Sequence, residues 1–102
     1  MINNYAIYQC PVNTDYCFRS FDEAKESWSI NDYVRVYSGT LETDSVNNAL
    51  EMLFVKFNMK RPSDYHGRSL SVSDVVWIGN GNKGEFYYCD SFGWSECPSE
   101  GR

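Results

Sequence analysis

The chain has little of what marks a nucleic-acid-binding, membrane or secreted protein. Its 102 residues hold 9 Lys and Arg against 14 Asp and Glu, a net charge of −5 that argues against nonspecific binding to a phosphate backbone. No apolar stretch approaches the roughly 20 residues of a membrane span. The N-terminal stretch MINNYAIYQC has neither the basic region nor the apolar run of a signal peptide. We therefore expect a cytoplasmic protein that binds neither nucleic acid nor a membrane directly.

Cysteines are few, and their spacing is not that of a metal site. The four lie at Cys10, Cys17, Cys89 and Cys97, without the short pairs that bind zinc. Most adjoin aromatic or aliphatic residues, among which a cysteine acts as a small apolar side chain. Reduced structural thiols are the first interpretation, with a disulfide or a metal site as alternatives. We predict no metal and no cofactor.

Motifs of known catalytic sites are also missing, although one stretch resembles a hydrolase triad. The only histidine, His66, opens YHGRSLSVSDVVWIGNGNKGEFYYCDSFGW (residues 65–94) beside serines and aspartates. The stretch has no G-x-S-x-G elbow. The alternating Ser69, Ser71 and Ser73 enter a strand, where serine hydroxyls more often cap turns. We predict that these residues are structural and that the chain is not an enzyme.

Strand and helix patterns alternate over the length of one domain, residues 1–102. Strands are predicted at residues 4–10, 31–41, 74–78 and 85–90, helices at 20–28 and 43–59, and a last turn or edge strand at 91–98. The GNGNKG segment lacks the form of a phosphate-binding loop and is predicted to be the turn of a hairpin. The order predicts an α+β fold, a small and mostly antiparallel sheet packed by two helices, with a C-terminal β-hairpin.

Both helices have start signals. Ser20 and Glu23 form a capping box before the first helix, and Asp44 or Ser45 is the N-cap of the second. Apolar residues of the second helix recur at steps of three and four, which predicts one stripe made by Val46, Ala49, Leu50, Leu53, Phe54 and Phe57. In the strand at 31–41, strict alternation predicts Tyr33, Arg35 and Tyr37 on one face and Val34 and Val36 on the other.

The loop after the second helix contains several polar residues that could form a site. Pro62 ends the helix, and Gly67 permits a backbone angle that other residues avoid. Asp64 and Arg68 suggest a local ion pair across the loop, which contributes about 0–1 kcal/mol if it is exposed. If it is partly buried, it could fix the loop and present Arg68 to a ligand. Asp74 follows Ser71 at capping distance, and Asp90 precedes Ser91 in an expected Asx turn.

Aromatic residues make up 17% of the chain, more than a core of this size can hide. We expect some of the following to reach the surface: Tyr5, Tyr8, Tyr33, Tyr37, Tyr65, Trp77, Tyr87, Tyr88, Phe92 and Trp94. Surface tyrosine and tryptophan on an acidic chain favour a protein-binding face. Alternatively, each tyrosine buries its ring and exposes only its hydroxyl.

Two long motifs resemble those of the YodL-like domain family. DYHGRSLSVSDVVWI (residues 64–78) is similar to the family's P-x-D-[YF]-x-G-x-S-[LM]-S-[VI]-S-D-V-[VI] loop, and FYYCDSFGW (residues 86–94) to its Y-[YF]-x-D-S-x-G-[FW] segment. YAIYQC, DYVRVYSGTL and LFVKFNMKRPSDY also look like family segments, so that the resemblance covers about residues 4–98. Cys89 before the aspartate and a terminal tryptophan are mild departures.

The resemblance implies a small module of firmicute chromosomes, phages, plasmids and conjugative elements, found beside anti-restriction-type domains. It implies no catalytic mechanism. The leading hypothesis is therefore a non-enzymatic inhibitor of a host defence protein, of the anti-CRISPR or anti-restriction type, which could occupy a basic nucleic-acid groove of a nuclease complex. The alternatives are a chromosomal adaptor for a cytoskeletal or cell-envelope factor, and an enzyme or nucleotide-binding domain using the Asp/Arg/Ser loop.

The candidate binding residues are those that are polar or aromatic in the two motifs. They are Asp64, Tyr65, Arg68, Ser71, Asp74, Tyr88, Asp90 and Trp94. The sequence does not indicate the oligomeric state.

Overall fold

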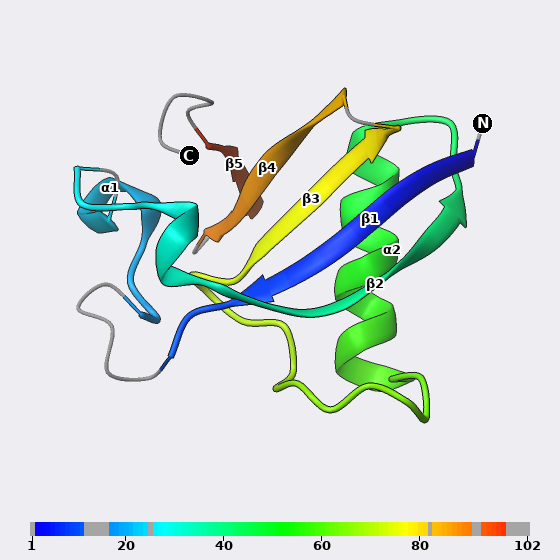
Figure 1. Ribbon diagram of the computed structural model, residues 1–102, viewed down its shortest axis with the longest axis horizontal. Coiled ribbons are helices and arrows are strands. Elements are labelled where there is room, and N and C mark those ends of the chain that lie inside the picture. The colour runs from blue at the N-terminus through cyan, green and yellow to red at the C-terminus, as the bar shows by residue number, and fades with distance from the viewer. Residues whose placement is uncertain (1, 12–16, 25, 82, 91–92, 98–102) are drawn as a thin grey trace.

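A computed structural model of the chain describes residues 2–11, 17–24, 26–81, 83–90 and 93–97. The elements, coloured along the chain in Figure 1, are β1 (Ile2–Gln9), α1 (Phe21–Ala24), the 3-10 helix η1 (Ile30–Asp32), β2 (Val34–Glu42), α2 (Val46–Met59), β3 (Val75–Asn80), β4 (Lys83–Asp90) and β5 (Gly93–Glu96). None of the helices in these described segments is long and apolar enough to span a membrane.

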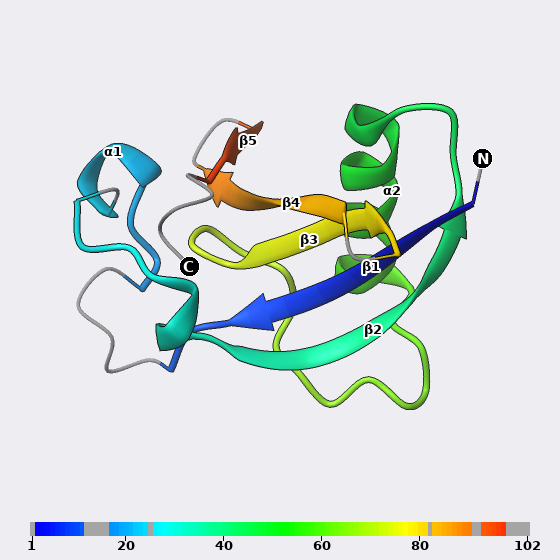
Figure 2. The ribbon, with the colours of Figure 1, turned by 45° about the horizontal axis from the view of Figure 1, so that its top comes forward.

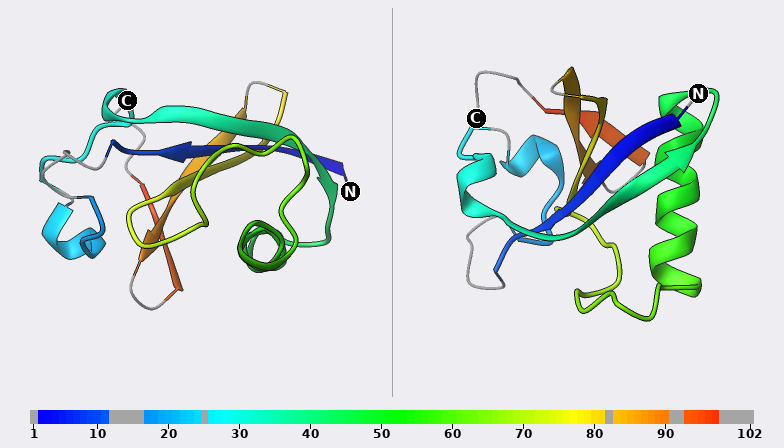
Figure 3. Two further views of the ribbon diagram at one scale, coloured as in Figure 1. Left: turned by 90° about the horizontal axis from the view of Figure 1, so that it is seen from below. Right: turned by 45° about the vertical axis from the view of Figure 1, so that its right-hand side comes forward.

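The five strands form one sheet in the order β2-β1-β3-β4-β5, with every neighbouring pair antiparallel. The sheet is strongly twisted, as the turned view of Figure 2 shows. In the left view of Figure 3, α1 and α2 lie on opposite sides of the part formed by β4 and β5. The predicted α+β fold with its C-terminal hairpin is confirmed, and the last segment is an edge strand.

One face of the sheet packs against α2 and forms the first core. Its buried members are Tyr5, Ile7, Ala49, Leu50, Leu53, Phe57, Tyr65, Leu70, Val76 and Ile78. The predicted stripe of α2 is narrower than expected, because Val46 and Phe54 remain 37% and 38% exposed. Ser45 is the N-cap, and its hydroxyl accepts a hydrogen bond from the Asn48 N–H at 3.1 Å.

The other face forms a second core under the segment that carries α1 and η1. Its buried members are Cys10, Ala24, Trp28, Tyr33, Val75, Tyr88 and Cys97. The predicted helix over residues 20–28 is too long, since α1 ends at Ala24 and Ser27 closes a turn onto the Ala24 carbonyl. Glu23 accepts hydrogen bonds from both the N–H and the hydroxyl of Ser20, so the carboxylate half of the capping box is present.

A β-bulge in β2 breaks the strict alternation predicted for this strand. Ile7 pairs with Tyr37 and Tyr8 pairs with Arg35, which leaves Val36 as the extra residue. Val36 and Tyr37 therefore both pack against the first core, whereas Val34 is 58% exposed. The predicted division into one face of Tyr33, Arg35 and Tyr37 and another of valines is wrong for this reason.

Candidate functional site

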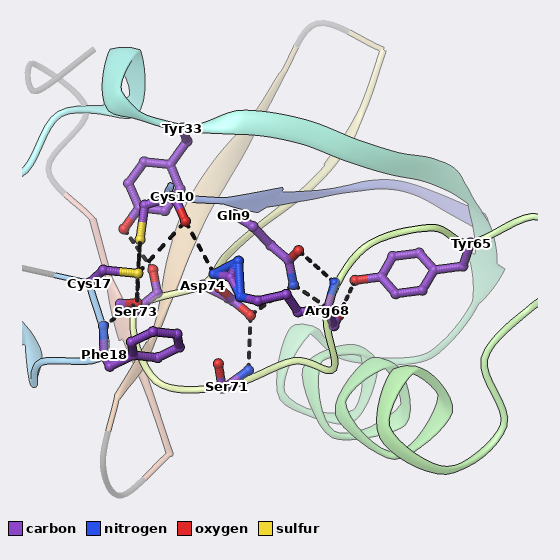
Figure 4. Close-up of polar contacts among 10 residues, drawn as sticks. All are labelled: Gln9, Cys10, Cys17, Phe18, Tyr33, Tyr65, Arg68, Ser71, Ser73 and Asp74. Carbon is purple, nitrogen blue, oxygen red and sulfur yellow. Dashed lines mark hydrogen bonds and ion pairs between the residues drawn. The ribbon is translucent and has the colours of Figure 1, made fainter. Parts of the chain in front are cut away.

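A buried carboxylate organises the loop between α2 and β3. Asp74 is fully buried, and its two oxygens accept three hydrogen bonds (Figure 4). Oδ2 accepts from the Ser71 N–H at 2.9 Å and from the Gln9 side-chain amide at 3.1 Å. Oδ1 accepts from Arg68 Nη2 at 3.2 Å. We call Gln9, Tyr65, Arg68, Ser71 and Asp74 the Asp74 cluster.

Gln9, the last residue of β1, fixes the loop to the sheet. Its Nε2 donates to the Arg68 carbonyl at 3.0 Å, and its Oε1 accepts from the Arg68 N–H at 3.0 Å. The Tyr65 hydroxyl donates a further hydrogen bond to the same carbonyl. Because both backbone groups of Arg68 are held in this way, the loop has one defined position on the end of β1.

Burial dominates the electrostatics of the cluster. It raises the pKa of the Asp74 carboxyl to about 6, although the Ser71 N–H, the Arg68 cation and the Gln9 amide all favour the charged form. Burial, followed by the nearby Asp74 charge, also raises the pKa of the Tyr65 hydroxyl. The carboxyl of Asp74 therefore titrates nearer neutrality than an exposed aspartate does.

Arg68 connects the cluster to the surface. Its side chain is 33% exposed, and Nη2 also donates to the Cys10 carbonyl at 3.2 Å. The guanidinium lies 5.3 Å from the centre of the Phe18 ring, which is itself 51% exposed and covers it. The Nε atom of Arg68 is buried and has no hydrogen-bond partner among the residues that the structure describes.

Next to the cluster lies a pair of cysteines held by Ser73. The sulfur atoms of Cys10 and Cys17, here called the thiol pair, are 2.8 Å apart, with Cys10 as the donor. Ser73 Oγ accepts from the Phe18 N–H at 2.8 Å and lies 3.5 Å from Cys10 Sγ. Ser73 and Phe18 both have positive φ angles, +83° and +69°, and Ser73 O accepts from the Tyr33 hydroxyl at 2.6 Å. Backbone conformations of this kind persist only where the surroundings enforce them.

Four of the eight predicted binding residues, namely Tyr65, Arg68, Ser71 and Asp74, meet in the Asp74 cluster. Asp64 does not join them, because it is exposed and accepts a hydrogen bond from the Tyr37 hydroxyl at 3.0 Å. The predicted Asp64–Arg68 ion pair is wrong, since Arg68 pairs with Asp74 instead.

The other three predicted residues lie elsewhere. Asp90 Oδ1 accepts from the N–H of Phe21, the first residue of α1, at 3.1 Å, and Oδ2 accepts from the Ser95 hydroxyl at 2.7 Å. Tyr88 is fully buried and donates to the Arg19 carbonyl at 2.6 Å. Trp94 packs edge-on against Phe54 of α2. The Asx turn expected at Ser91 falls outside the described residues.

The loop also differs in detail from its predicted chemistry. Gly67 does not have a positive φ; an added Cβ there would lie 2.6 Å from the Tyr65 hydroxyl and 2.9 Å from Gln9 Oε1. The capping pattern predicted for Ser71 and Asp74 is present, because Asp74 Oδ2 accepts from the Ser71 backbone N–H. The Ser73 hydroxyl accepts from the Phe18 N–H. His66 is exposed and has no hydrogen bond or ion pair to a described serine or aspartate.

Sequence reasoning missed Gln9, Phe18 and the pairing of Cys10 with Cys17. Gln9 is 4% exposed at the end of an apolar strand, and a polar residue in that place was the only available signal. No three metal-binding side chains are grouped within the described residues.

The most exposed apolar residues are not the aromatic residues named above. Of the ten aromatic residues named above, the nine that are described are buried or half-buried. A row on α2 is more exposed: Met52 at 50%, Val55 at 53% and Met59 at 79%. We call these three residues the α2 row.

An apolar groove and an acidic hollow flank the α2 row. The groove lies between α2 and β2 and is lined by Tyr5, Leu41, Glu51, Met52, Leu53, Val55, Lys56 and Lys60. The hollow, beside Met52 at the start of α2, is lined by Glu42, Asp44 and Glu51 together with Thr43 and Asn48. Exposed apolar side chains next to acids are typical of a protein-binding surface.

Comparison with curated proteins and with solved structures returned no match. The family model described as YodL-like domain matches residues 4–99, nearly the whole chain and both of its motifs. The Asp74 cluster, with its Pro62–Asp74 loop, lies within that match. The chain therefore belongs to the YodL-like domain family.

Proposed function

We propose that this YodL-like domain is a non-catalytic protein-binding module that inhibits a host defence protein in the bacterial cytoplasm. The target would be a nucleic-acid-cleaving complex whose basic groove the domain covers. The observation that carries the proposal is the exposed α2 row of Met52, Val55 and Met59, whose first member, Met52, lines the hollow formed by Glu42, Asp44 and Glu51.

The two parts of this surface have different roles in the proposal. The α2 row supplies the apolar contact that binding needs at its centre. The neighbouring carboxylates and the net charge of −5 attract the positively charged groove in which the target nuclease binds nucleic acid. The domain then competes with DNA or RNA without resembling either in shape.

The Asp74 cluster supports the same conclusion by contrast. Both carboxylate oxygens of Asp74 and both backbone groups of Arg68 are already used in bonds within the protein. A ligand for this carboxylate would have to replace those bonds and open a fully buried site. We infer that the cluster supports the fold and that the partner binds at α2.

Substitution of Val55 tests the proposal in cells. A bacterial strain with one nuclease-based defence system is challenged with a phage that the system restricts, with and without the chain. Expression of the wild-type chain is expected to restore plaque formation. Val55→Glu is expected to abolish this effect, because an unpaired carboxylate in a closed interface costs at least about 2 kcal/mol, roughly 30-fold in affinity.

Val34→Glu is the matched control. Val34 is 58% exposed, close to the 53% of Val55, but it lies at the opposite end of β2 from Leu41 and the groove. This variant should protect the phage as the wild type does. If Val55→Glu protects equally well while Arg68→Ala, shown to be folded by circular dichroism, does not, the partner binds at the Asp74 cluster instead. If the wild type protects against no nuclease system tested, the inhibitor proposal is wrong.

Competition with purified components tests the mechanism. The chain should displace DNA from the affected nuclease, and the displacement should weaken as salt screens the charges. A double variant, Asp44→Asn with Glu51→Gln, should slow association without changing the fold. Binding that leaves the nuclease–DNA complex intact would contradict occupation of the groove.

A further inference from the structure

The thiol pair is unusual because its two sulfurs approach each other closely. Cys10 Sγ and Cys17 Sγ are 2.8 Å apart, compared with about 2.05 Å in a disulfide bond. Because the two sulfur atoms are already this close, a small displacement of Cys17 would allow a disulfide bond to form. The two cysteines are seven positions apart in the sequence. Figure 4 shows both side chains pointing toward each other, with the Ser73 side chain beside them.

The two cysteines differ in their access to solvent. Cys10 is 1% exposed, whereas Cys17 is half-buried and is the only one of the four cysteines that is not buried. A small reagent can therefore reach Cys17 first. Burial, followed by the hydrogen bond to Cys17, raises the pKa of the Cys10 thiol to about 11, so Cys10 remains protonated at neutral pH until it reacts.

Ser73 positions both sulfurs. Its hydroxyl donates toward Cys17 Sγ at 3.8 Å, lies 3.5 Å from Cys10 Sγ and accepts the Phe18 N–H at 2.8 Å. Since the hydroxyl oxygen already accepts from Phe18, its own proton is available for sulfur, where it stabilises negative charge. Ser73 and Phe18 both have a positive φ, a backbone conformation that the surrounding contacts enforce.

We propose that Cys10 and Cys17 form a modification site at which a low-molecular-weight disulfide closes a reversible intramolecular disulfide bond. The Cys17 thiolate attacks one sulfur of the small disulfide and releases one small thiolate. Cys10 then loses its proton and attacks Cys17 Sγ, which releases the second small thiolate. The two protein thiols lose two electrons, and the small disulfide gains them and is reduced to two thiols.

The bond would stabilise the neighbourhood of the Asp74 cluster. It joins Cys10, whose carbonyl accepts from Arg68, to Cys17, whose neighbour Phe18 covers the Arg68 guanidinium. Closing this short loop restricts the unfolded chain and should raise the melting temperature by several degrees. Burial of Cys10 directs a reductant to Cys17 and makes Cys10, with its high pKa, a poor leaving group.

The experiment exposes the folded, fully reduced chain to oxidised glutathione and follows it by intact mass. The wild type should lose the mass of two hydrogens and gain no adduct, peptide mapping should join Cys10 to Cys17, and dithiothreitol should reverse both changes. The Cys97→Ala variant, which removes a buried cysteine outside the pair, should react in the same way. A stable glutathione adduct on the wild type, another pairing or a disulfide-linked dimer would overturn the proposal.

Two single variants separate the steps. Cys10→Ala should stop at a glutathione adduct on Cys17, since no second thiol is in contact with it. Cys17→Ser, at the more exposed position, should remain unmodified at times when the wild type is fully oxidised. An equally fast reaction of Cys17→Ser would show that Cys17 is not the point of entry, and circular dichroism verifies that each variant is folded.

Discussion

At the scale of single residues, Asp74 combines full burial with a side chain that is charged when it is exposed to water. Its carboxylate is fully buried, yet it has a cation and two neutral donors as partners. Burying a charge costs free energy even when the charge is paired. At Asp74 this desolvation cost exceeds the stabilisation that the charged form gains from its hydrogen bonds and its ion pair. The pKa of about 6, against 3.8 for an exposed aspartate, expresses this difference.

The raised pKa makes stability depend on pH with an unusual sign. Below pH 3.8 the carboxyl is protonated in both states. Between about pH 4 and 6 the unfolded chain has lost the proton that the folded chain keeps, so the Asp74 contribution to the free energy of unfolding falls as pH rises. Two pKa units correspond to about 3 kcal/mol, and above pH 6 the contribution is constant.

The variant Asp74→Asn isolates this contribution. It removes the titration, so the free energy of unfolding of the variant should lack the fall that Asp74 causes between about pH 4 and 6. Urea unfolding of both proteins from pH 4 to 7 should show the wild type losing up to about 3 kcal/mol of stability relative to the variant as pH rises. A wild type that gains stability relative to the variant as pH rises would mean that the pKa of Asp74 in the folded state lies below 3.8.

The sequence predicted the membership of this cluster better than its contacts. Tyr65, Arg68, Ser71 and Asp74 were identified because polar residues gather in one loop with turn chemistry. The partner of Arg68 was assigned wrongly, since a local pattern favours Asp64 over Asp74 without knowledge of the loop path. Gln9 lies 59 residues from Arg68, and no periodicity connects positions so far apart.

At the scale of elements, the β3–β4 hairpin is shaped by glycines that face each other. Gly79 pairs with Gly84, and the Trp77 indole lies across both. A Cβ added at Gly84 would lie 2.5 Å from the Ile78 carbonyl oxygen and 2.5 Å from the indole. The backbone oxygen cannot move away, so these glycines are required for space and not for a special backbone angle.

Gly84→Ala should therefore destabilise the domain by about 2–3 kcal/mol, because the hairpin has to open or the indole has to leave its place. Thermal unfolding followed by circular dichroism measures this loss. Gly81→Asn is the control: φ is +63° there, an added Cβ meets no atom within 4 Å, and asparagine tolerates that angle. Equal losses for the two variants would show that the contact with Trp77 and Ile78 has no special effect.

Local patterns identified the hairpin and α2 because turn residues and periodic apolar residues determine such elements. Local patterns gave wrong results where tertiary contacts determine the length or the register of an element. The first helix is shortened to four residues, and the segment after it supplies Trp28 to the second core. The bulge at Val36 depends on the register between β1 and β2, which strand alternation alone cannot reveal.

At the scale of the whole molecule, the sheet has a core on each face, and the same strands serve both. Successive residues Val75 and Val76 of β3 are fully buried in different cores. In β4, Tyr88 is fully buried in the second core, and its neighbour Tyr87 is partly buried against the first. Neither core can therefore lose its sheet surface without disturbing the other. We expect the described domain to unfold as one cooperative unit.

Phe57→Leu tests this coupling from the first core. Phe57 is fully buried and packs edge-on against three tyrosine rings, so the change should cost about 1–2 kcal/mol and lower the melting temperature by roughly 5–10 °C. The background Trp77→Phe, Trp94→Phe leaves Trp28, in the second core, as the only tryptophan. Its fluorescence should report the same lowered midpoint as far-UV circular dichroism, because β1, β3 and β4 carry the disturbance through the sheet. A Trp28 transition that stays at its original temperature would show instead that the two cores melt independently.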